Sequence, residues 1–276
     1  MKPRHWMDAA WRYAGLSAVA LLTTGPFLWL LATSLKGANE AVMGPQASLW
    51  PQQPTLEHYA AVMATQPFAL YLFNSVIVAA MAVLANVTLS SLAAYPLARM
   101  DFAGRRWVFG VLLATMMVPI QLLMIPLYEL AVALGLRNSA LGLVLPHACT
   151  AFGIFFMRQA FLSVPRALEE VALVEGVSRL RIWWHVMLPM VRPALATLAI
   201  FTFVGAWGDF LWPLVLMDEP ARYTLPLGVN RLAGTFSMDW RLVAAGAVFS
   251  ILPILAVYAV GQRWLIAGVM KGAVKG

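Results

Sequence analysis

Charged residues are scarce in this chain. Asp, Glu, Lys and Arg make up 11% of its 276 residues, whereas hydrophobic residues make up 62%. A soluble globular chain is about 25% charged, and a domain of this length could not bury so much apolar surface. The composition, with a mean hydropathy of +0.78, therefore excludes an ordinary soluble protein and predicts that a lipid bilayer surrounds much of the chain.

The sequence also lacks the alternation of apolar and polar residues that marks the strands of a membrane barrel. Its apolar runs are continuous, and a helix needs about 20 such residues to cross the roughly 30 Å hydrocarbon core. Because only helices and closed barrels satisfy their backbone groups in lipid, we predict an all-α membrane protein with one transmembrane domain over residues 1–276. Its six predicted spans cover residues 13–35, 71–98, 107–128, 138–157, 192–217 and 242–262.

Catalytic and nucleotide-binding motifs are missing as well. The sequence has no G-x-x-x-x-G-K-[ST] loop, no H-E-x-x-H and no G-x-S-x-G. Its four histidines are scattered, so no metal site is predicted, and His147 is expected to hydrogen-bond within the helix bundle. The single cysteine, Cys149, cannot form an internal disulfide and is expected to be a small buried hydrophobe. We therefore expect neither an enzyme nor a chain that binds a cofactor.

The distribution of positive charge predicts the orientation in the membrane. The formal net charge is +7, but the excess follows membrane sidedness, so no nucleic-acid partner is expected. The two tails and the second and fourth loops between spans hold 14 of the 19 Lys and Arg. Because cytoplasmic loops carry the excess of positive charge, both termini and the fourth loop are predicted to be cytoplasmic. The segment from Lys36 to about Leu70 then faces outward, with a short helix near residues 56–63.

Several prolines fall in or near the predicted spans. Proline removes a helix hydrogen bond and kinks the helix. Membrane helices tolerate it where neighbouring groups satisfy the freed backbone, and this interpretation is favoured over a bundle that rocks open and shut. These prolines are Pro26, Pro96, Pro119, Pro126, Pro146, Pro213 and Pro253.

Residues 163–189, here called the elbow, form the one long, charged, amphipathic segment. Ser163-Val164-Pro165 predicts a helix start, and Glu169 and Glu170 follow near the positive end of the helix dipole. Gly176 is expected to end this helix in the left-handed conformation.

A second short helix is expected after this glycine, with Ser178 as its N-cap. The result is a bent pair of helices with an apolar face and a charged rim. Such a segment could lie among lipid headgroups or serve as a docking site for another protein. The apolar faces are predicted to contain Leu168, Val171 and Ala172 on the first helix, and Ile182, Trp183 and Val186 on the second.

The elbow carries a recognisable pattern. Glu170-Val171-Ala172, Gly176 and Leu188-Pro189 resemble the EAA…G…LP coupling loop of ABC importer permeases. Nearly all 276 residues are similar to the second permease of carbohydrate-uptake systems of the maltose-transporter type, including the six-span layout. Further matching stretches are Asn74-Ser75, residues 206–210 and residues 268–276.

This resemblance implies partners. In that family the coupling loop docks in a groove of a separate cytoplasmic ATPase, which binds the ATP and Mg²⁺. It also implies a second, homologous permease, two ATPase copies, an extracytoplasmic solute-binding protein and a prokaryotic plasma membrane. Lys271 and Lys275 of the tail either contact the ATPase or are ordinary flanking charges. The expected docking residues are Glu169, Glu170, Val171, Ala172, Glu175, Gly176, Leu188 and Pro189.

The chain departs from the family pattern at three positions of the elbow. Val171 and Val177 replace the usual alanines, and Glu175 replaces the usual aspartate. The two valines add methyl groups at a packed joint, whereas Glu175 keeps the charge. We therefore expect a partner ATPase with slightly more room in its cleft.

Polar and aromatic residues within the spans are candidates for a translocation path. Asp209 is the carboxylate deepest in a predicted span, and such charges usually face the bundle or a water-filled cavity. It could equally lie near the outer interface, because it is only about two turns from the next loop. Aromatic residues near span ends are often interface anchors instead. The candidates are Asn86, Gln121, Asn138, Trp207, Asp209, Phe210 and Trp212.

The sequence thus predicts the membrane-spanning permease subunit of an ATP-driven ABC importer for a sugar or sugar-like solute. A secondary transporter driven by an ion gradient is the alternative. It would be expected to show path carboxylates and an inverted repeat, whereas the chain offers only Asp209 and no clear repeat. A membrane enzyme would need a catalytic cluster within the spans, and none is visible.

Overall fold

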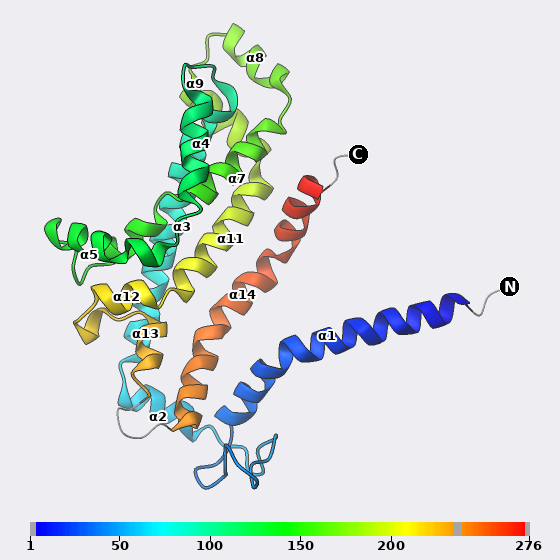
Figure 1. Cartoon of the computed structure of the whole chain (residues 1–276), viewed down its shortest axis with the longest axis vertical. Coiled ribbons are helices and arrows are strands. Elements are labelled where there is room, and N and C mark those ends of the chain that lie inside the picture. Colours follow the sequence, from blue (N-terminus) through cyan, green and yellow to red (C-terminus); the bar gives the residue numbers. More distant parts are fainter. Residues whose placement is uncertain (1–3, 234–238, 274–276) are drawn as a thin grey trace. The chain divides into compact units, whose positions relative to one another are not determined.

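The computed structural model describes the backbone of residues 4–233 and 239–273, and the side chains of residues 9–233 and 239–264. The described residues form helices and no strands (Figure 1), which confirms the all-α prediction. The predicted single domain comprises two compact units. The smaller unit is Met1–Phe68 with Gly228–Leu252, and the larger unit is Ala69–Leu227 with Pro253–Gly276.

The smaller unit contains α1 (Arg4–Ser34), α2 (Glu57–Thr65) and the first part of α14 (Trp240–Ala273). The helix predicted near residues 56–63 is therefore confirmed as α2. The most apolar stretch of α1 has none of its residues buried within the chain, so its apolar side chains are available to lipid or to another subunit.

The loop between α1 and α2 is held by two cations. The buried Lys36 donates from Nζ to Ala41 O at 3.0 Å and to Ser48 O at 2.6 Å. Arg241, at the start of α14, donates from Nη1 to Gly37 O at 3.0 Å. The loop therefore has a fixed conformation within the smaller unit.

In the larger unit, α3 (Phe68–Arg99), α7 (Ala151–Leu162) and α11 (Arg192–Gly208) run side by side (Figure 1). Asn86 of α3 joins them, because its Nδ2 donates to Thr202 Oγ1 at 2.8 Å and its Oδ1 accepts from Thr150 N at 3.1 Å. A Cβ at Gly153 would lie 2.6 Å from Ser90 Oγ. The helices approach so closely there that only glycine fits.

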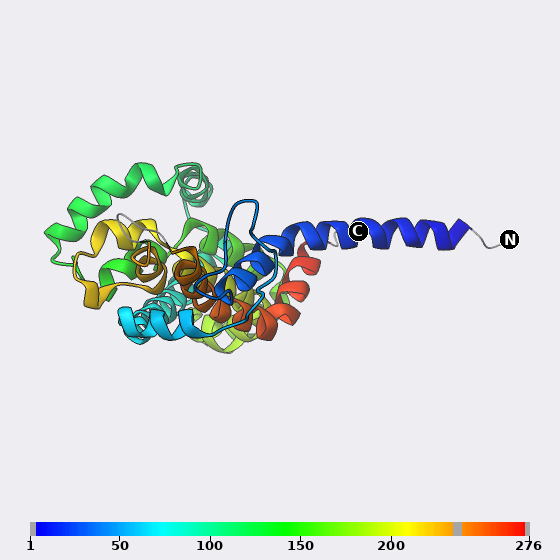
Figure 2. The same cartoon turned by 90° about the horizontal axis from the view of Figure 1, so that it is seen from below.

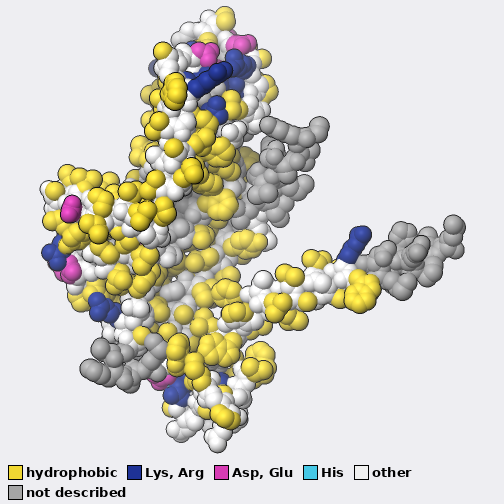
Figure 3. All heavy atoms as spheres, in the orientation of Figure 1, with side chains coloured by type: hydrophobic (Ala, Val, Ile, Leu, Met, Phe, Trp, Pro, Cys, Tyr) yellow, Lys and Arg dark blue, Asp and Glu magenta, His cyan; other side chains and the backbone are white. Residues whose placement is uncertain are grey.

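Charged side chains gather at the end of the larger unit that carries the elbow helices, and its middle is mostly hydrophobic (Figure 3). This distribution suits a bilayer around the middle of the helices. The elbow end contains α8 (Arg166–Val174), α9 (Arg179–Ile182), the π-helical η3 (Trp183–Met187) and α10 (Leu188–Met190). The opposite end contains α12 (Leu211–Leu216), η4 (Pro220–Arg222) and α13 (Leu225–Asn230).

The third predicted span, 107–128, is not one continuous helix. α4 (Arg105–Thr115) ends four residues before Pro119, and the chain resumes in η1 (Ile120–Leu123) and α5 (Met124–Ala133), bent by 93°. Figure 2 shows α4 nearly end-on while α5 runs across the view. Pro119 permits the break, because it cannot donate a helix hydrogen bond and disfavours helix at the residue before it.

The fourth and fifth predicted spans are also interrupted. α6 (Ala140–Val144) and η2 (Leu145–His147) are bent by 50° from α7. α11 ends at Gly208, and Asp209 is extended before α12 begins. Cys149 lies in the break before α7 and is exposed, so the prediction of a buried cysteine was wrong.

Within the described residues, three helices are long and apolar enough to cross a membrane: Ala9–Ser34, Phe68–Arg99 and Trp240–Trp264. The count reaches six only if each of three bent pairs is one span. Pro26, Pro96 and Pro253 lie inside continuous helices, as the favoured interpretation of the prolines predicts.

Candidate functional site

The elbow folds as two helices around a glycine. α8 begins directly after Pro165, and Gly176 adopts φ +76° two residues after α8 ends. Val177 N donates to Ala172 O at 3.0 Å, which closes the helix end. A Cβ added at Gly176 would meet no atom within 4 Å, so the glycine is needed for its backbone conformation and not for space within this chain.

The second part of the elbow leads into the membrane helix. α9, η3 and α10 run to Met190, and α11 then departs at 84°. Ile182 and Trp183 are buried and Val186 is partly buried, so the predicted apolar side of the second helix packs against the rest of the unit. Ser178 occupies the N-cap position but makes no side-chain cap bond. The predicted N-cap position is therefore confirmed, but the capping hydrogen bond is not formed. Because Ser178 is exposed, water can satisfy the first N–H groups of α9.

The predicted apolar face of α8 is not its buried face. Leu168 and Val171 are exposed and Ala172 is only partly buried, whereas Glu169 is buried. Helical spacing identifies residues that share a face, but it does not show that Arg99, 70 residues earlier in the chain, pairs with Glu169 and so favours burial of that side.

Four side chains form the Glu169 cluster: Tyr95, Arg99, Glu169 and Arg179. Tyr95 Oη donates to Glu169 Oε1 at 2.6 Å. Arg99 Nε lies 3.7 Å from Oε2, and Arg179 Nη1 lies 3.4 Å from Oε1. The side chains of Glu169 and Arg99 are 6% and 3% exposed. A buried carboxylate is tolerated only when it is paired and hydrogen-bonded, and this one has two cations and a hydroxyl.

The cluster ties the elbow to the membrane helices. Besides contacting Glu169, Arg99 Nη2 donates to Phe161 O at 2.6 Å and to Val164 O. Through Arg99 and Tyr95 the carboxylate of α8 is fixed to the end of α3 and to the end of α7. A displacement of α8 must therefore move these helices or break a buried ion pair.

The outer side of the elbow is apolar and exposed. Glu170 and Glu175 are also exposed beside it. Several large apolar side chains exposed on a charged end are typical of a site of contact with another protein or with lipid. This exposed apolar face consists of Val171 (63% exposed), Val174 (89%), Leu180 (63%) and Trp184 (57%).

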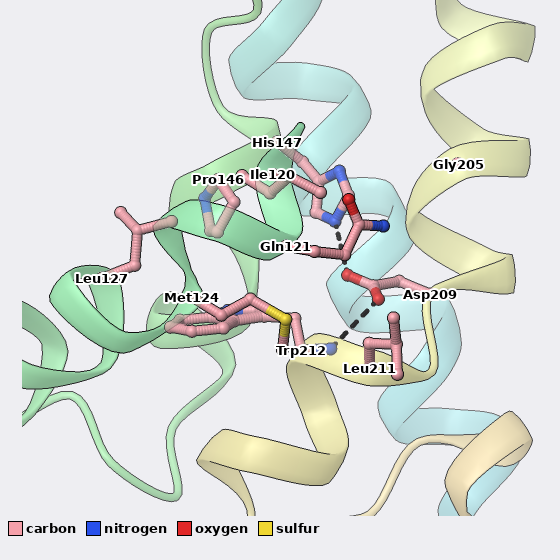
Figure 4. Close-up of a pocket in the computed structure, with 10 residues that line it drawn as sticks. All are labelled: Ile120, Gln121, Met124, Leu127, Pro146, His147, Gly205, Asp209, Leu211 and Trp212. Atoms are coloured by element: carbon pink, nitrogen blue, oxygen red, sulfur yellow. Dashed lines mark hydrogen bonds and ion pairs between the residues drawn. The ribbon is translucent and has the colours of Figure 1, made fainter. Parts of the chain in front are cut away.

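A second site is a cavity of about 340 Å³, here called the pocket (Figure 4). Three of its lining residues, Gln121, Asp209 and Trp212, are among the predicted path residues. His147 also lines it, with Nε2 3.0 Å from Asp209 Oδ2. The sequence did not predict that His147 and Asp209 are partners. Each is an ionisable residue within an apolar run, which marked each one separately as a candidate functional residue.

The other path candidates do not line the pocket. Asn86 is buried between α3, α7 and α11, as described above. Trp207 is buried and stacks on Phe203 at 5.3 Å, and Phe210 is partly exposed. Asn138 has φ +55° and accepts from Asp218 N at 2.7 Å, so it fixes the turn after α12.

Two remaining expectations concern the tail and metals. The side chain of Lys271 and the whole of Lys275 lie outside the described residues. Among the residues that the structure does describe, no group of three His, Cys, Asp or Glu could hold a metal ion.

Known proteins are similar in sequence to this chain over most of its length. The sulfoquinovosyl glycerol transport system permease protein SmoH of Agrobacterium fabrum is 34% identical, over 95% of this chain and 93% of that protein. The arabinooligosaccharides transport system permease protein AraQ of Bacillus subtilis is 31% identical over 94% and 92%. The diacetylchitobiose uptake system permease protein NgcG of Streptomyces coelicolor is 34% identical over 96% and 88%.

The fold is also known. A chain of a bacterial ABC transporter involved in the import of the acidic polysaccharide alginate matches with a TM-score of 0.83 and 23% identity, over 95% of this chain and 98% of that one. The profile of the binding-protein-dependent transport system inner membrane component family matches residues 86–271, more than half of the sequence. The chain therefore belongs to this family and is a membrane-spanning permease of an ABC transporter.

Proposed function

We propose that this permease imports a sugar or sugar-like solute and that its elbow receives the stroke of a separate ATPase. The observation that carries the proposal is the exposed apolar face of the elbow, which the Glu169 cluster holds rigidly on the membrane helices. The solute class is supported by the names of the relatives, which describe the uptake of glycosides and oligosaccharides.

The proposed assembly contains this chain, a second homologous permease, two copies of the ATPase and an extracytoplasmic solute-binding protein. ATP and Mg²⁺ are bound by the ATPase. The elbow and both termini lie in the cytoplasm, in agreement with the excess of Lys and Arg there. Lys271 and Lys275 are then within the cytoplasmic tail, where they can contact the ATPase.

The mechanism follows from the geometry of the elbow. A groove of the ATPase covers Val171, Val174 and the turn at Gly176, while Glu170 lies at the rim. When the ATPase closes, α8 moves with it as a rigid helix. Glu169 fixes α8 to α3 and, through Arg99, to the end of α7, and α10 is joined to α11 at a bend of 84°. The movement therefore reaches three membrane helices, which open the solute path to one side of the membrane and then to the other.

Gly176 provides the test. A leucine there has room within this chain but would project into the docked ATPase and strain a left-handed residue. In the reconstituted complex, Gly176→Leu should lower solute uptake per ATP hydrolysed by about tenfold, a coupling loss of about 1.4 kcal/mol. The measurement is uptake and ATP hydrolysis in the same proteoliposomes.

Gly135 is a matched control. It also has positive φ, at +69°, and an added Cβ would meet no atom within 4 Å. Gly135 lies just after α5, outside the elbow. Gly135→Leu should therefore keep the coupling ratio. Unchanged coupling in Gly176→Leu, or an equal loss in both variants, would contradict docking at the elbow.

A further inference from the structure

Three interruptions of helices converge on the pocket of the larger unit. One wall comes from η1 after the Pro119 break, a second from η2 at Pro146, and a third from the extended Asp209 between α11 and α12. Irregular backbone among membrane helices is tolerated where protein buries it or where it lines a cavity. The convergence of three such breaks on one cavity therefore indicates a built site rather than a packing defect.

The polar groups of the pocket point to a ligand that both donates and accepts hydrogen bonds. Asp209 Oδ1 accepts from Trp212 N at 3.2 Å and Oδ2 contacts His147, but a carboxylate can accept about four bonds, so capacity remains. Gln121 is exposed and its amide points toward Asp209 and His147 (Figure 4). It offers a donor and an acceptor at the same place.

The remaining lining is apolar and includes one fixed aromatic ring. Trp212 is buried, and its Nε1 donates to Gly142 O at 2.9 Å, which holds the indole in place. Ile120 and Leu211 of the rim are 49% and 45% exposed, so the cavity opens to the surface of the unit. A fixed aromatic face beside carboxylate and amide groups suits a sugar ring, which presents C–H groups on its faces and hydroxyls at its edge.

Charge and size narrow the ligand class. The residues that line the pocket include Asp209 and its partner His147 but neither Lys nor Arg. An anionic group would therefore approach the carboxylate without a Lys or Arg to bind it. The cavity of about 340 Å³ is near the lower end of the roughly 300–1,000 Å³ range of small-molecule sites. It has room for one or two rings and not for a longer chain.

We propose that the pocket is a subsite of this subunit that binds one neutral, hydroxyl-rich ring of the solute during its passage. The inference rests on the proposed transport function and deepens it, because it places a solute contact on this permease itself. Asp209 and Gln121 bind hydroxyls, His147 orients the carboxylate of Asp209, and Trp212 supports a face of the ring.

The test measures direct binding to the full-length chain in lipid nanodiscs. The probes are the methyl glycosides of glucose, galactose and mannose, with glucuronic acid and glucose 6-phosphate as anionic counterparts. Saturation-transfer NMR should detect millimolar binding of at least one neutral probe, and at least about tenfold weaker binding of both anions. Gln121→Ala and Asp209→Asn should each weaken the binding of the neutral probe by about tenfold, which corresponds to about 1.4 kcal/mol of binding free energy.

Gln159→Ala is the control, because Gln159 is an exposed residue of α7 that does not line the pocket. Three results would overturn the proposed subsite: no saturable binding of any neutral probe, equal binding of the anions, or an unchanged dissociation constant of the neutral probe in Gln121→Ala. If Gly176→Leu still uncouples transport in that case, the permease function stands and only the subsite fails.

Discussion

Glu169 of the larger unit and Lys36 of the smaller unit are buried charged residues that find their partners in different ways. Glu169 of the larger unit meets the side chains of Tyr95, Arg99 and Arg179. Lys36 of the smaller unit meets backbone carbonyls of its own loop, those of Ala41 and Ser48. The first charge is bound by other helices, and the second is bound by the segment to which it belongs.

The difference indicates whether a movement in each region can be transmitted to other helices. Tyr95 and Glu169 are 74 residues apart, so their bond joins separate helices. The carbonyls that hold Lys36 are 5 and 12 residues away, so its bonds shape one loop and move with it. Removal of Glu169 should therefore affect the whole larger unit and the coupling, whereas removal of Lys36 should affect one loop.

The largest expected effect is that of Glu169→Gln. The amide keeps an acceptor for Tyr95 but leaves Arg99, 3% exposed, without a counter-charge. Loss of one partner of a buried ion pair costs about 3 to 5 kcal/mol, so the purified variant should unfold at a clearly lower temperature. Thermal unfolding in detergent measures this change.

Glu170→Gln is the control for the same substitution one residue away. Glu170 is exposed, so its variant should keep the thermal stability of the wild type and lose ATPase docking instead, measured as ATPase retained on the purified permease. Equal stability of both variants and the wild type would show that the Glu169 cluster does not hold the elbow.

An intermediate effect is expected for Lys36→Met. Methionine fills a similar space, but the carbonyls of Ala41 and Ser48 lose their donor, at about 1 to 3 kcal/mol for each buried group left unsatisfied. The loop between α1 and α2 should become sensitive to proteases while the larger unit keeps its stability. Limited proteolysis with mass spectrometry locates the cleavage.

Gln52→Ala is the control for Lys36→Met. Among the described residues, the exposed side chain of Gln52 has no hydrogen-bond partner, and only its backbone N donates, to Glu40. Protease resistance in Lys36→Met equal to that of Gln52→Ala would mean that Lys36 does not stabilise the loop.

The same comparison separates what the sequence predicts from what it does not. The helix after Pro165 and the turn at Gly176 are local features, and both lie where the sequence predicts them. Glu169 and Glu170 are adjacent and chemically identical, yet one is buried and the other exposed. The difference arises because Arg99, which lies on another helix, pairs with Glu169. The local sequence around Glu169 contains no sign of this contact.

The helix breaks show a similar limit. Pro96 lies within a continuous helix, whereas Pro119 lies at a 93° bend. Both prolines lack the N–H group, so the residue itself does not distinguish a tolerated proline from a break. What differs is the tertiary surroundings, because the backbone after Pro119 lines the pocket with His147 and Asp209.

The smallest expected effect concerns a single carboxylate of the smaller unit. Glu40 accepts backbone hydrogen bonds from Gln52 N and Gln53 N, both at 2.9 Å, and from Gly37 N at 3.1 Å. These bonds, that from Gln52 first, hold the pKa of Glu40 below its ordinary value of 4.5. A lowered folded-state pKa stabilises the loop above pH 4.5, and this contribution is lost as the pH falls through the folded-state pKa. Hydrogen exchange of the Gln52 and Gln53 amides, corrected for intrinsic rates, should therefore be constant near neutral pH and faster below pH 4.5. Glu40→Gln should remove this pH dependence, and an identical acid response in the variant would assign it to another group.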